Sequence, residues 1–288
     1  MPPRPPVVGL PHQLDRDRCL VMGVVNVTTD SFSDGGSYFD ADRAVAHGLG
    51  LSRDGADIVD VGGESTRPGA RRVSVADETA RVQPVIERLV AAGVLVSVDT
   101  MRAQVAEVAV AAGAVLVNDV SGGLADPDML PFLASSQVPC VLMHWRGHSR
   151  SMMQLTEYPN GVVADVRDEL RERMQAAESA GVDPERIVVD PGIGFAKQPD
   201  DNWPLLARLE ELMELGRPVL VGASRKRFLG DLLMAAGRPS EPGDRDVATA
   251  AVSALVAAAG AWCVRVHDVA PTMDAVRVAA AYRDAGRS

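Results

Sequence analysis

The feature that most constrains the fold is a regular alternation of short apolar runs and helical patterns along nearly the whole chain. Eight runs rich in Val, Ile and Leu recur, at residues 20–25, 57–61, 94–98, 115–117, 140–143, 187–189, 219–221 and 262–266. Runs of this kind are typical of strands buried on both faces, as in a parallel sheet. The intervening helical segments would connect each strand to the next one in the same direction.

Glycine punctuates the junctions between helices and strands. Six of the seven helix-to-strand junctions carry one a few residues before the strand, namely Gly55, Gly93, Gly113, Gly181, Gly216 and Gly260. Glycine at that place takes the left-handed conformation that ends a helix. Pro139 at the seventh junction would also stop a helix, and Pro84 inside a helical pattern predicts a kink or a later start.

Eight β–α units in 288 residues favour an α/β fold with a single (β/α)8 TIM barrel. An open doubly wound sheet is the alternative, because sequence does not show whether a sheet closes. No GxGxxG follows the first strand, which weakens a dinucleotide-binding version of that sheet. We expect a short, extended proline-rich leader over residues 1–18 and the barrel domain over residues 19–288.

Charge and composition narrow the class of partners. A net charge of −10 argues against nucleic acid, which requires clustered cations, but leaves room for a small anion in a locally basic pocket. No window approaches 18 apolar residues, so no membrane span is expected. The three cysteines have no CxxC spacing and the N-terminus resembles no signal peptide, which predicts buried thiols in a cytoplasmic protein.

Every apolar run ends in polar or charged residues, and active sites of (β/α) barrels are built at that end of the strands. These residues are Asn26, Asp60, Glu64, Asp99, Asn118, Asp119, His144, Asp190, Ser224, Arg225, Lys226, Arg265 and His267. Any one of them alone is best explained as a polar residue facing a loop. Eight polar exits on one rim indicate a site.

The residue types at the rim suggest a ligand. Lys226, Arg265 and His267 would supply donors for phosphate oxygens, unless they only pair with barrel acids. Asn26 offers the kind of oxygen that Mg²⁺ accepts alongside phosphates.

A second set of rim residues would accept hydrogen bonds. Asp99, Asn118 and Asp190 could accept from the N–H edge of a heterocycle, or could form a buried network that only rigidifies the barrel. Asp190 could equally begin a turn with Pro191 and Gly192. Two loops, residues 26–36 and 62–69, carry glycines and hydroxyls that suit mobile lids.

At these positions the chain resembles the dihydropteroate synthase family of bacterial folate biosynthesis, in its actinobacterial form. The resemblance runs from about Val21 to the C-terminus and rests on MGVVNVTTDSFSDGG, DVGGESTRPGA, VSVDT, VNDVSGG, VLMH, VDPGIGFAK, VGASRKRF and RVHD, in order. It implies a barrel that joins 6-hydroxymethyl-7,8-dihydropterin diphosphate to p-aminobenzoate with Mg²⁺. It also implies a homodimer for which sulfonamides compete with p-aminobenzoate.

The resemblance further implies roles for individual residues. The pterin pocket would comprise Asp99, Asn118, Met143, Asp190, Phe195, Gly222 and Lys226. The pyrophosphate would meet Asn26, Arg265 and His267, with Asn26 also at the Mg²⁺. The p-aminobenzoate side would comprise Thr66, Arg67, Pro68, Lys226 and Arg227. The catalytic group would comprise Asp190, Lys226, Arg265 and His267, with Phe32 and Asp34 from the first loop.

Three other functions remain open at this point. A catalytically silent pterin-binding paralogue could share the fold, since fold does not determine function. A pterin-dependent methyltransferase or a Schiff-base aldolase using Lys226 could also be built on this barrel. The intact ESTRPG, DPGIGFAK and SRKRF motifs favour the synthase, although Thr29 stands where many members of the family have proline.

Overall fold

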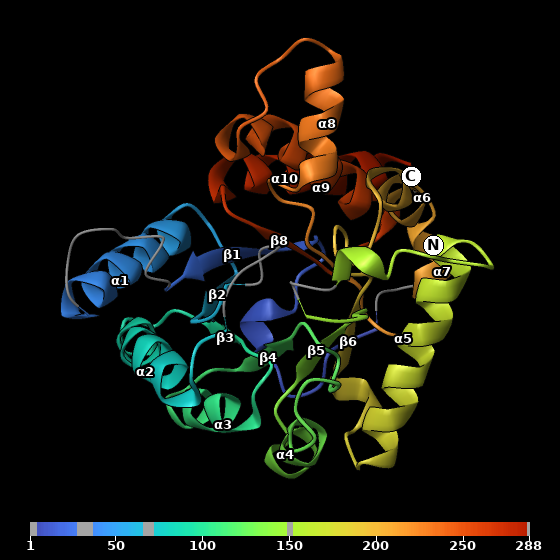
Figure 1. The fold of residues 1–288 in the computed structure, drawn as a ribbon. Helices are drawn as coiled ribbons and strands as arrows, with labels where there is room; N and C mark the ends of the chain where they lie inside the picture. The colour runs from blue at the N-terminus through green and yellow to red at the C-terminus, as the bar shows by residue number, and fades with distance from the viewer. Residues whose placement is uncertain (1–4, 28–36, 66–71, 149–151, 287–288) are drawn as a thin grey trace.

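The computed structural model describes residues 5–27, 37–65, 72–148 and 152–286, and its strands form a barrel (Figure 1). The eight parallel strands lie in the order β6-β5-β4-β3-β2-β1-β8-β7, and a parallel bridge between Val189 and Val219 joins the two ends of that order. The strands are β1 (Leu20–Asn26), β2 (Ile58–Gly62), β3 (Val96–Asp99), β4 (Leu116–Asp119), β5 (Cys140–Met143), β6 (Ile187–Asp190), β7 (Leu220–Val221) and β8 (Cys263–Val266). The predicted TIM barrel is confirmed, and the open sheet is not found.

Helices surround the strands on the outside of the barrel (Figure 1). The α-helices are α1 (Ser37–Arg53), α2 (Val75–Ala91), α3 (Ala103–Ala111), α4 (Met129–Ser136), α5 (Val162–Ser179), α6 (Asn202–Ala207), α7 (Leu209–Met213), α8 (Arg227–Ala235), α9 (Asp246–Ala259) and α10 (Val269–Ala285). Short 3-10 helices are η1 (His12–Leu14), η2 (Met152–Gln154), η3 (Pro184–Arg186), η4 (Pro199–Asp201) and η5 (Pro242–Arg245). In the described part of the chain, no helix combines the length and apolar content needed to cross a bilayer.

The core has two parts because side chains alternate between the faces of each strand. One cluster packs the outer face of the strands against the helices. The other fills the amino end of the barrel interior with Leu20, Met22, Ile58, Leu116, Val141, Val188, Leu220 and Cys263. The next inward-facing residue on most strands is polar, so the interior changes from apolar to polar toward the carboxyl ends. The three cysteines are buried and form no disulfide with one another, as predicted.

The sequence predicted an extended leader, but residues 1–18 are not extended throughout where the structure describes them. Residues 12–14 form η1, and the backbone N–H of Val8 donates to Glu185 O at 2.9 Å. Leu14 is buried against the interior cluster, and Val7 and Leu10 pack beside it. The leader therefore closes the amino end of the barrel, where otherwise apolar side chains would meet water.

The helix ends confirm the prediction made for the six glycines. They correct the prediction for Pro139 and exclude a late helix start at Pro84. All six junction glycines have φ between +71° and +110°. At the seventh junction Gln137, not Pro139, ends α4 in the left-handed conformation, with φ of 57°. The predicted late start at Pro84 is wrong, because α2 begins at Val75 after the Ser74 hydroxyl accepts from Asp77 N at 3.1 Å.

Two of the junction glycines allow backbone strain to be separated from packing. Gly93→Ala should cost about 1–2 kcal/mol, because φ is +80° and nothing lies within 4 Å of an added Cβ. Gly113→Ala should cost about 1–3 kcal/mol more, since its Cβ would lie 2.8 Å from Val90 Cγ1. Urea unfolding measures both free energies. Equal losses would show that the Val90 contact carries no cost.

Candidate active site

Several of the residues predicted at the strand exits lie in one layer at the carboxyl end of the barrel. Strand register aligns Asn26 with Gly62, Gly62 with Asp99, and Asp99 with Asn118. By side-chain alternation, Asp99 and Asn118 face the interior above the apolar cluster, as Arg265 does on β8. The polar layer therefore sits where barrels carry chemistry.

Arg265 is the centre of this layer. Its Nε donates to Asp60 Oδ2 at 2.6 Å, and its Nη2 donates to Asp99 Oδ2 at 2.7 Å. Asn118 Nδ2 donates to the same oxygen of Asp60 at 3.1 Å. Burial raises the pKa of Asp99 to about 7, opposed by the charge of Arg265. The pairing with barrel acids that the sequence left open for Arg265 is thus present, and it connects four strands.

Asp60 was among the polar strand ends but was not predicted to take part in the site. It is fully buried and receives hydrogen bonds from both Arg265 and Asn118 on one oxygen. Its other oxygen, Oδ1, is buried with no hydrogen-bond partner among the described residues. The signal in the sequence was its position two residues before the end of β2, which places it on the inward face.

Asp190 serves both as a turn residue and as a rim carboxylate. Its Oδ1 accepts from Gly192 N at 2.7 Å, which is the turn that its sequence context predicted. Burial raises its pKa, opposed by the charge of Lys226. Gly222 lies opposite, where an added Cβ would come 4.0 Å from Asp190 Oδ2 and 3.8 Å from Arg265 Cβ. The structure therefore brings these predicted pterin residues together.

Two more predicted pterin residues flank this carboxylate. Met143 is aligned with Asp190 in the β5–β6 register and is 2% exposed. Lys226 Nζ lies 4.5 Å from the centroid of the Phe195 ring and donates to Ile193 O. Burial lowers the pKa of Lys226 to about 8, opposed by Asp190.

The consecutive residues Ser224, Arg225 and Lys226 have separate tasks. The Ser224 hydroxyl accepts from His267 N at 3.1 Å and lies 3.0 Å from His267 Nδ1. These two contacts orient the imidazole of His267 toward Ser224. Arg225, with a left-handed φ of 58°, forms a two-pronged pair with Asp246 at 2.7 and 2.8 Å. All three were predicted at the rim, but only Lys226 was given a role there.

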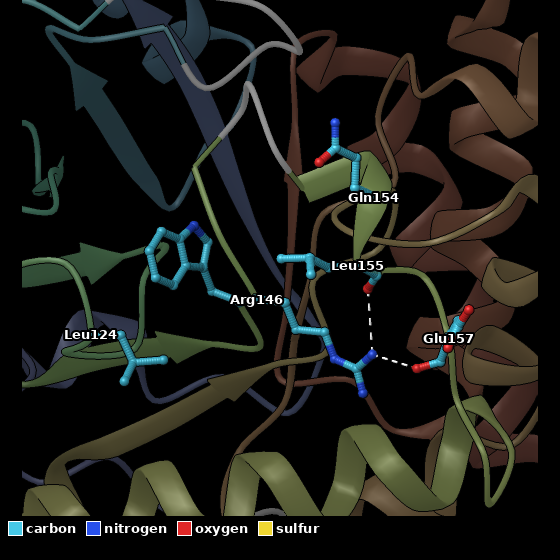
Figure 2. Close-up of a pocket in the computed structure, with 6 residues that line it drawn as sticks. Leu124, Arg146, Gln154, Leu155 and Glu157 are labelled. Carbon is cyan, nitrogen blue, oxygen red and sulfur yellow. Dashed lines mark hydrogen bonds between the residues drawn. The ribbon is translucent and has the colours of Figure 1, made fainter.

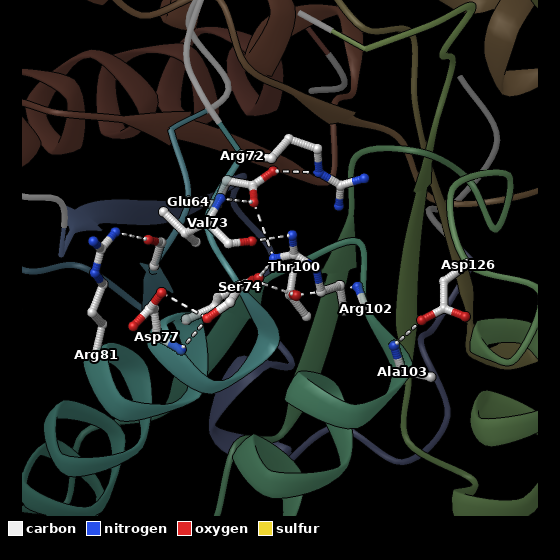
Figure 3. Close-up of polar contacts among 12 residues, drawn as sticks. Glu64, Arg72, Val73, Ser74, Asp77, Arg81, Thr100, Arg102, Ala103 and Asp126 are labelled. Atoms are coloured by element: carbon white, nitrogen blue, oxygen red, sulfur yellow. Dashed lines mark hydrogen bonds and ion pairs between the residues drawn. The ribbon is translucent and has the colours of Figure 1, made fainter.

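Ion pairs anchor both ends of the loop after β2 (Figure 3). Glu64 accepts from Arg72 Nε at 3.2 Å and from Val73 N at 3.1 Å, and it pairs with Arg102 at 3.0 Å. Arg102 also pairs with Glu78, whose pKa is raised by burial. These contacts fix residues 64 and 72–73 relative to the starts of α2 and α3.

Several predicted residues lie outside the described part of the chain. These are Phe32 and Asp34 of the first loop, and Thr66, Arg67 and Pro68 of the second. Arg227, also predicted for p-aminobenzoate, is described. Its side chain is 88% exposed, on the first turn of α8.

A pocket of about 500 Å³ lies next to the residues that follow β5 (Figure 2). It is lined by Leu124, Trp145, Arg146, Gln154, Leu155 and Glu157, none of them a predicted site residue. Every donor nitrogen of Arg146 is already engaged, with Glu169 or with the carbonyls of residues 155 and 157. Among the described residues that line the pocket, Arg146 is the one cation, and it is already paired.

The described residues contain no group of three or more His, Cys, Asp or Glu arranged to hold a metal ion. Asn26, at the end of β1, supplies one hard oxygen at the rim. Mg²⁺ keeps several waters and commonly binds through one or two protein oxygens plus substrate phosphates. The residues present therefore fit a magnesium held mainly by a diphosphate.

Comparisons with known proteins agree with this geometry. The family model described as pterin binding enzyme matches residues 22–267. The dihydropteroate synthase of Mycobacterium leprae is 54% identical over 92% of this chain and 94% of its own length. The Xanthomonas albilineans dihydropteroate synthase with 4-aminobenzoic acid has a TM-score of 0.85 at 50% identity, covering 93% and 94% of the two chains. The Yersinia pestis enzyme with a sulfonamide drug complex has a TM-score of 0.87 at 38% identity, covering 96% and 98%.

Removing the cation from the polar layer should expose how much the layer depends on it. Arg265→Met leaves two buried carboxylates without their partner and should cost about 3 kcal/mol or more. In the folded variant these two buried carboxyl groups would keep their protons above pH 5. In the unfolded chain they would lose them, because an exposed Asp has a pKa of about 4. The variant's free energy of unfolding should therefore fall as pH rises from about 5 to about 8, more steeply than in the parent.

Urea unfolding at several pH values measures this dependence. Adding Asp60→Asn to Arg265→Met should restore part of the stability at high pH, because one uncompensated charge is gone. A loss that is the same at every pH would contradict the assignment.

Proposed function

Since the chain belongs to the dihydropteroate synthases, a family of pterin-binding enzymes, we propose how its described residues carry out the reaction. The protein condenses 6-hydroxymethyl-7,8-dihydropterin diphosphate with p-aminobenzoate to give 7,8-dihydropteroate and pyrophosphate, in folate biosynthesis. The observation that carries the assignment of residues is the single polar layer in which acceptors and cations meet at the carboxyl end of the barrel.

The pterin ring binds to Asp99, Asn118 and Asp190 through its polar edge. These side chains are buried, and Asp99 and Asn118 lie near Asp60, whose Oδ1 has no partner among the described atoms. Buried groups in this state favour a ligand that supplies the missing donors. Met143 and Phe195 provide the apolar faces for the ring, and Gly222 leaves room for it between Asp190 and Arg265.

The diphosphate binds at Arg265, His267 and Asn26. Arg265 can exchange part of its pairing with Asp60 and Asp99 for phosphate oxygens, since a guanidinium has five donors. The Ser224 hydroxyl contacts His267 N and Nδ1 and so orients the ring, and an imidazole with a proton on Nε2 would donate to an anion. Magnesium, when bound with Asn26, would neutralise charge on the leaving group.

The chemistry requires charge stabilisation more than covalent help. The bond between the pterin methylene and the diphosphate oxygen breaks, and its electron pair leaves with pyrophosphate. The resulting cation is stabilised by resonance in the ring and by the Asp190 carboxylate. The aniline nitrogen of p-aminobenzoate then forms the new C–N bond, and its proton passes to pyrophosphate. Arg265 and His267 act by stabilising the departing anion.

The p-aminobenzoate subsite is assigned to Thr66, Arg67, Pro68, Lys226 and Arg227, with Phe32 and Asp34 of the first loop closing over the reacting methylene. Of these residues, Lys226 and Arg227 belong to the described part of the chain. Glu64 and Arg72 anchor the second loop next to the polar layer. Lys226 has its ammonium at the rim. Sulfonamides, as mimics of p-aminobenzoate, would bind the same subsite.

A homodimer forms through the outer faces of α9 and α10, which lie together on one side of the barrel (Figure 1). Large apolar side chains are exposed there, with Val247 at 82%, Leu255 at 71%, Val278 at 66% and Tyr282 at 78%. Exposed apolar residues at helical spacing on neighbouring helices are typical of association surfaces. We also place the protein in the reducing cytoplasm, which suits three buried cysteines that form no disulfide with one another.

Asp190 provides a direct test of the reaction. Asp190→Asn keeps an oxygen for Gly192 N but removes the charge, so turnover in a condensation assay should fall about a hundredfold while thermal stability changes little. Asp119→Asn is a matched control: Asp119 is also buried and accepts from Ser121 N and Gly123 N, but it faces away from the barrel interior. Equal losses of turnover in both variants would refute the role of Asp190.

The dimer surface can be tested by placing charge on it. Leu255→Lys should convert the protein to a monomer in size-exclusion chromatography with light scattering, because a lysine cannot be buried there unpaired. Leu124→Lys introduces the same charge at another exposed leucine, beside the pocket after β5, and should leave the mass unchanged. A Leu255→Lys protein that stays dimeric would place the interface elsewhere.

A further inference from the structure

Side chains donate hydrogen bonds to four backbone carbonyls of the loop that follows β6. Lys197 Nζ donates to Gly192 O and to Phe195 O, each at 3.0 Å. Lys226 Nζ donates to Ile193 O, and the Tyr158 hydroxyl donates to Ala196 O at 2.8 Å. Because this loop connects Asp190 to Phe195, its shape determines the relation between a rim carboxylate and an aromatic face.

The loop also contains backbone conformations that do not persist unaided. Gly192 and Gly194 have φ of +65° and +76°, and Ala196, which has a Cβ, has φ of 49°. A non-glycine residue in the left-handed region is strained and persists where its surroundings impose that conformation. The hydrogen bonds from Lys197 and Tyr158 lie on either side of this strained residue.

Lys197 is itself held in one orientation. It is 2% exposed, and its third partner is His144 Nδ1 at 3.0 Å. His144 must then accept at Nδ1 and donate from Nε2 to Glu169 Oε2, which lies 3.0 Å away. Glu169 is also paired with Arg146. The three protons of the ammonium therefore have three acceptors.

Burial disfavours the charged form of Lys197. Burial, with a further effect of Lys226, lowers the pKa of Lys197 to about 7. Burial likewise lowers the pKa of His144 to about 4, so the imidazole is neutral and available as an acceptor. A buried ammonium 2% exposed that donates to two carbonyls of one loop is better explained by positioning than by stability alone.

We propose that Lys197, oriented by His144 and Glu169, is a positioning residue that fixes the loop after β6 so that Phe195 lies against the pterin ring. This inference rests on the proposed pterin site and adds to it a residue that does not touch the substrate. Lys197 acts through Phe195, because its ammonium donates to the Phe195 carbonyl. The ring of Phe195 lies beside the Lys226 ammonium.

A double-mutant cycle on pterin binding tests the inference. Lys197→Met keeps the length of the side chain but removes the donors, and it should weaken binding of 6-hydroxymethylpterin, measured by calorimetry, by about tenfold or more. In a Phe195→Ala background the same substitution should have little further effect, because the ring that Lys197 positions is absent. In turnover, Lys197→Met should raise KM for the pterin diphosphate and leave KM for p-aminobenzoate unchanged.

A matched control separates positioning from general stability. Arg18→Met also removes a partly buried cation, one paired with Asp57 at 2.7 Å at the amino end of the barrel. It should lower the melting temperature without changing pterin affinity. Lys197→Arg should recover part of the affinity if donation to the two carbonyls is what matters.

The outcomes distinguish this inference from the proposed function. A wild-type protein that binds no pterin would overturn the proposed site. Normal pterin binding by Lys197→Met, or an equal loss in the presence and absence of the Phe195 ring, would overturn the positioning role alone. A loss matched by Arg18→Met would reduce Lys197 to a stabilising residue.

Discussion

The polar layer depends on one interaction, the guanidinium of Arg265 between the carboxylates of Asp60 and Asp99. Two carboxylates in a barrel interior would repel each other and would lose their hydration without a cation between them. Arg265 makes the arrangement possible, and Asn118 extends it to a fourth strand. The site is therefore assembled before any ligand arrives, and an arriving anion finds donors that are already oriented.

The same interaction sets a condition on the ligand. A diphosphate can bind Arg265 only if another donor replaces the guanidinium at the carboxylates of Asp60 and Asp99. A heterocycle with N–H groups at Asp99 and Asn118 would do so, which couples the two ends of one substrate through a single side chain. The sequence suggested an anion site and a heterocycle site separately. In the structure both sites depend on the charge of Arg265.

Much of this could be predicted from the chain, because strand alternation and parallel direction are local rules. They place Asp99, Asn118, Asp190 and Arg265 on one inward-facing layer without any knowledge of distances. The left-handed glycines follow from steric rules of the same kind. Contacts that depend on the three-dimensional path were not predictable. The partnership of Lys197 with His144 spans 53 residues, and no spacing reports it.

Local patterns also misled where tertiary packing took precedence. The proline-rich leader has no periodicity, yet Leu14 is buried because the open end of the barrel provides an apolar surface. Gln137 ends α4 in a conformation that glycine would adopt more easily, with its side-chain amide donating to Ala134 O at 2.6 Å. Asp60 was visible as a strand-end acid, but only the register showed that it faces Arg265.

The junction between β6 and β7 has a thermodynamic consequence. The two strands meet through a single bridge between Val189 and Val219, and β7 has only two residues. Lys226, after β7, reaches across this seam to Ile193, after β6, and Asp190 and Gly222 lie on its two sides. A ligand bound between Asp190 and Gly222 would connect the two strands further. Ligand binding and closure of the barrel would then be linked equilibria, each favouring the other.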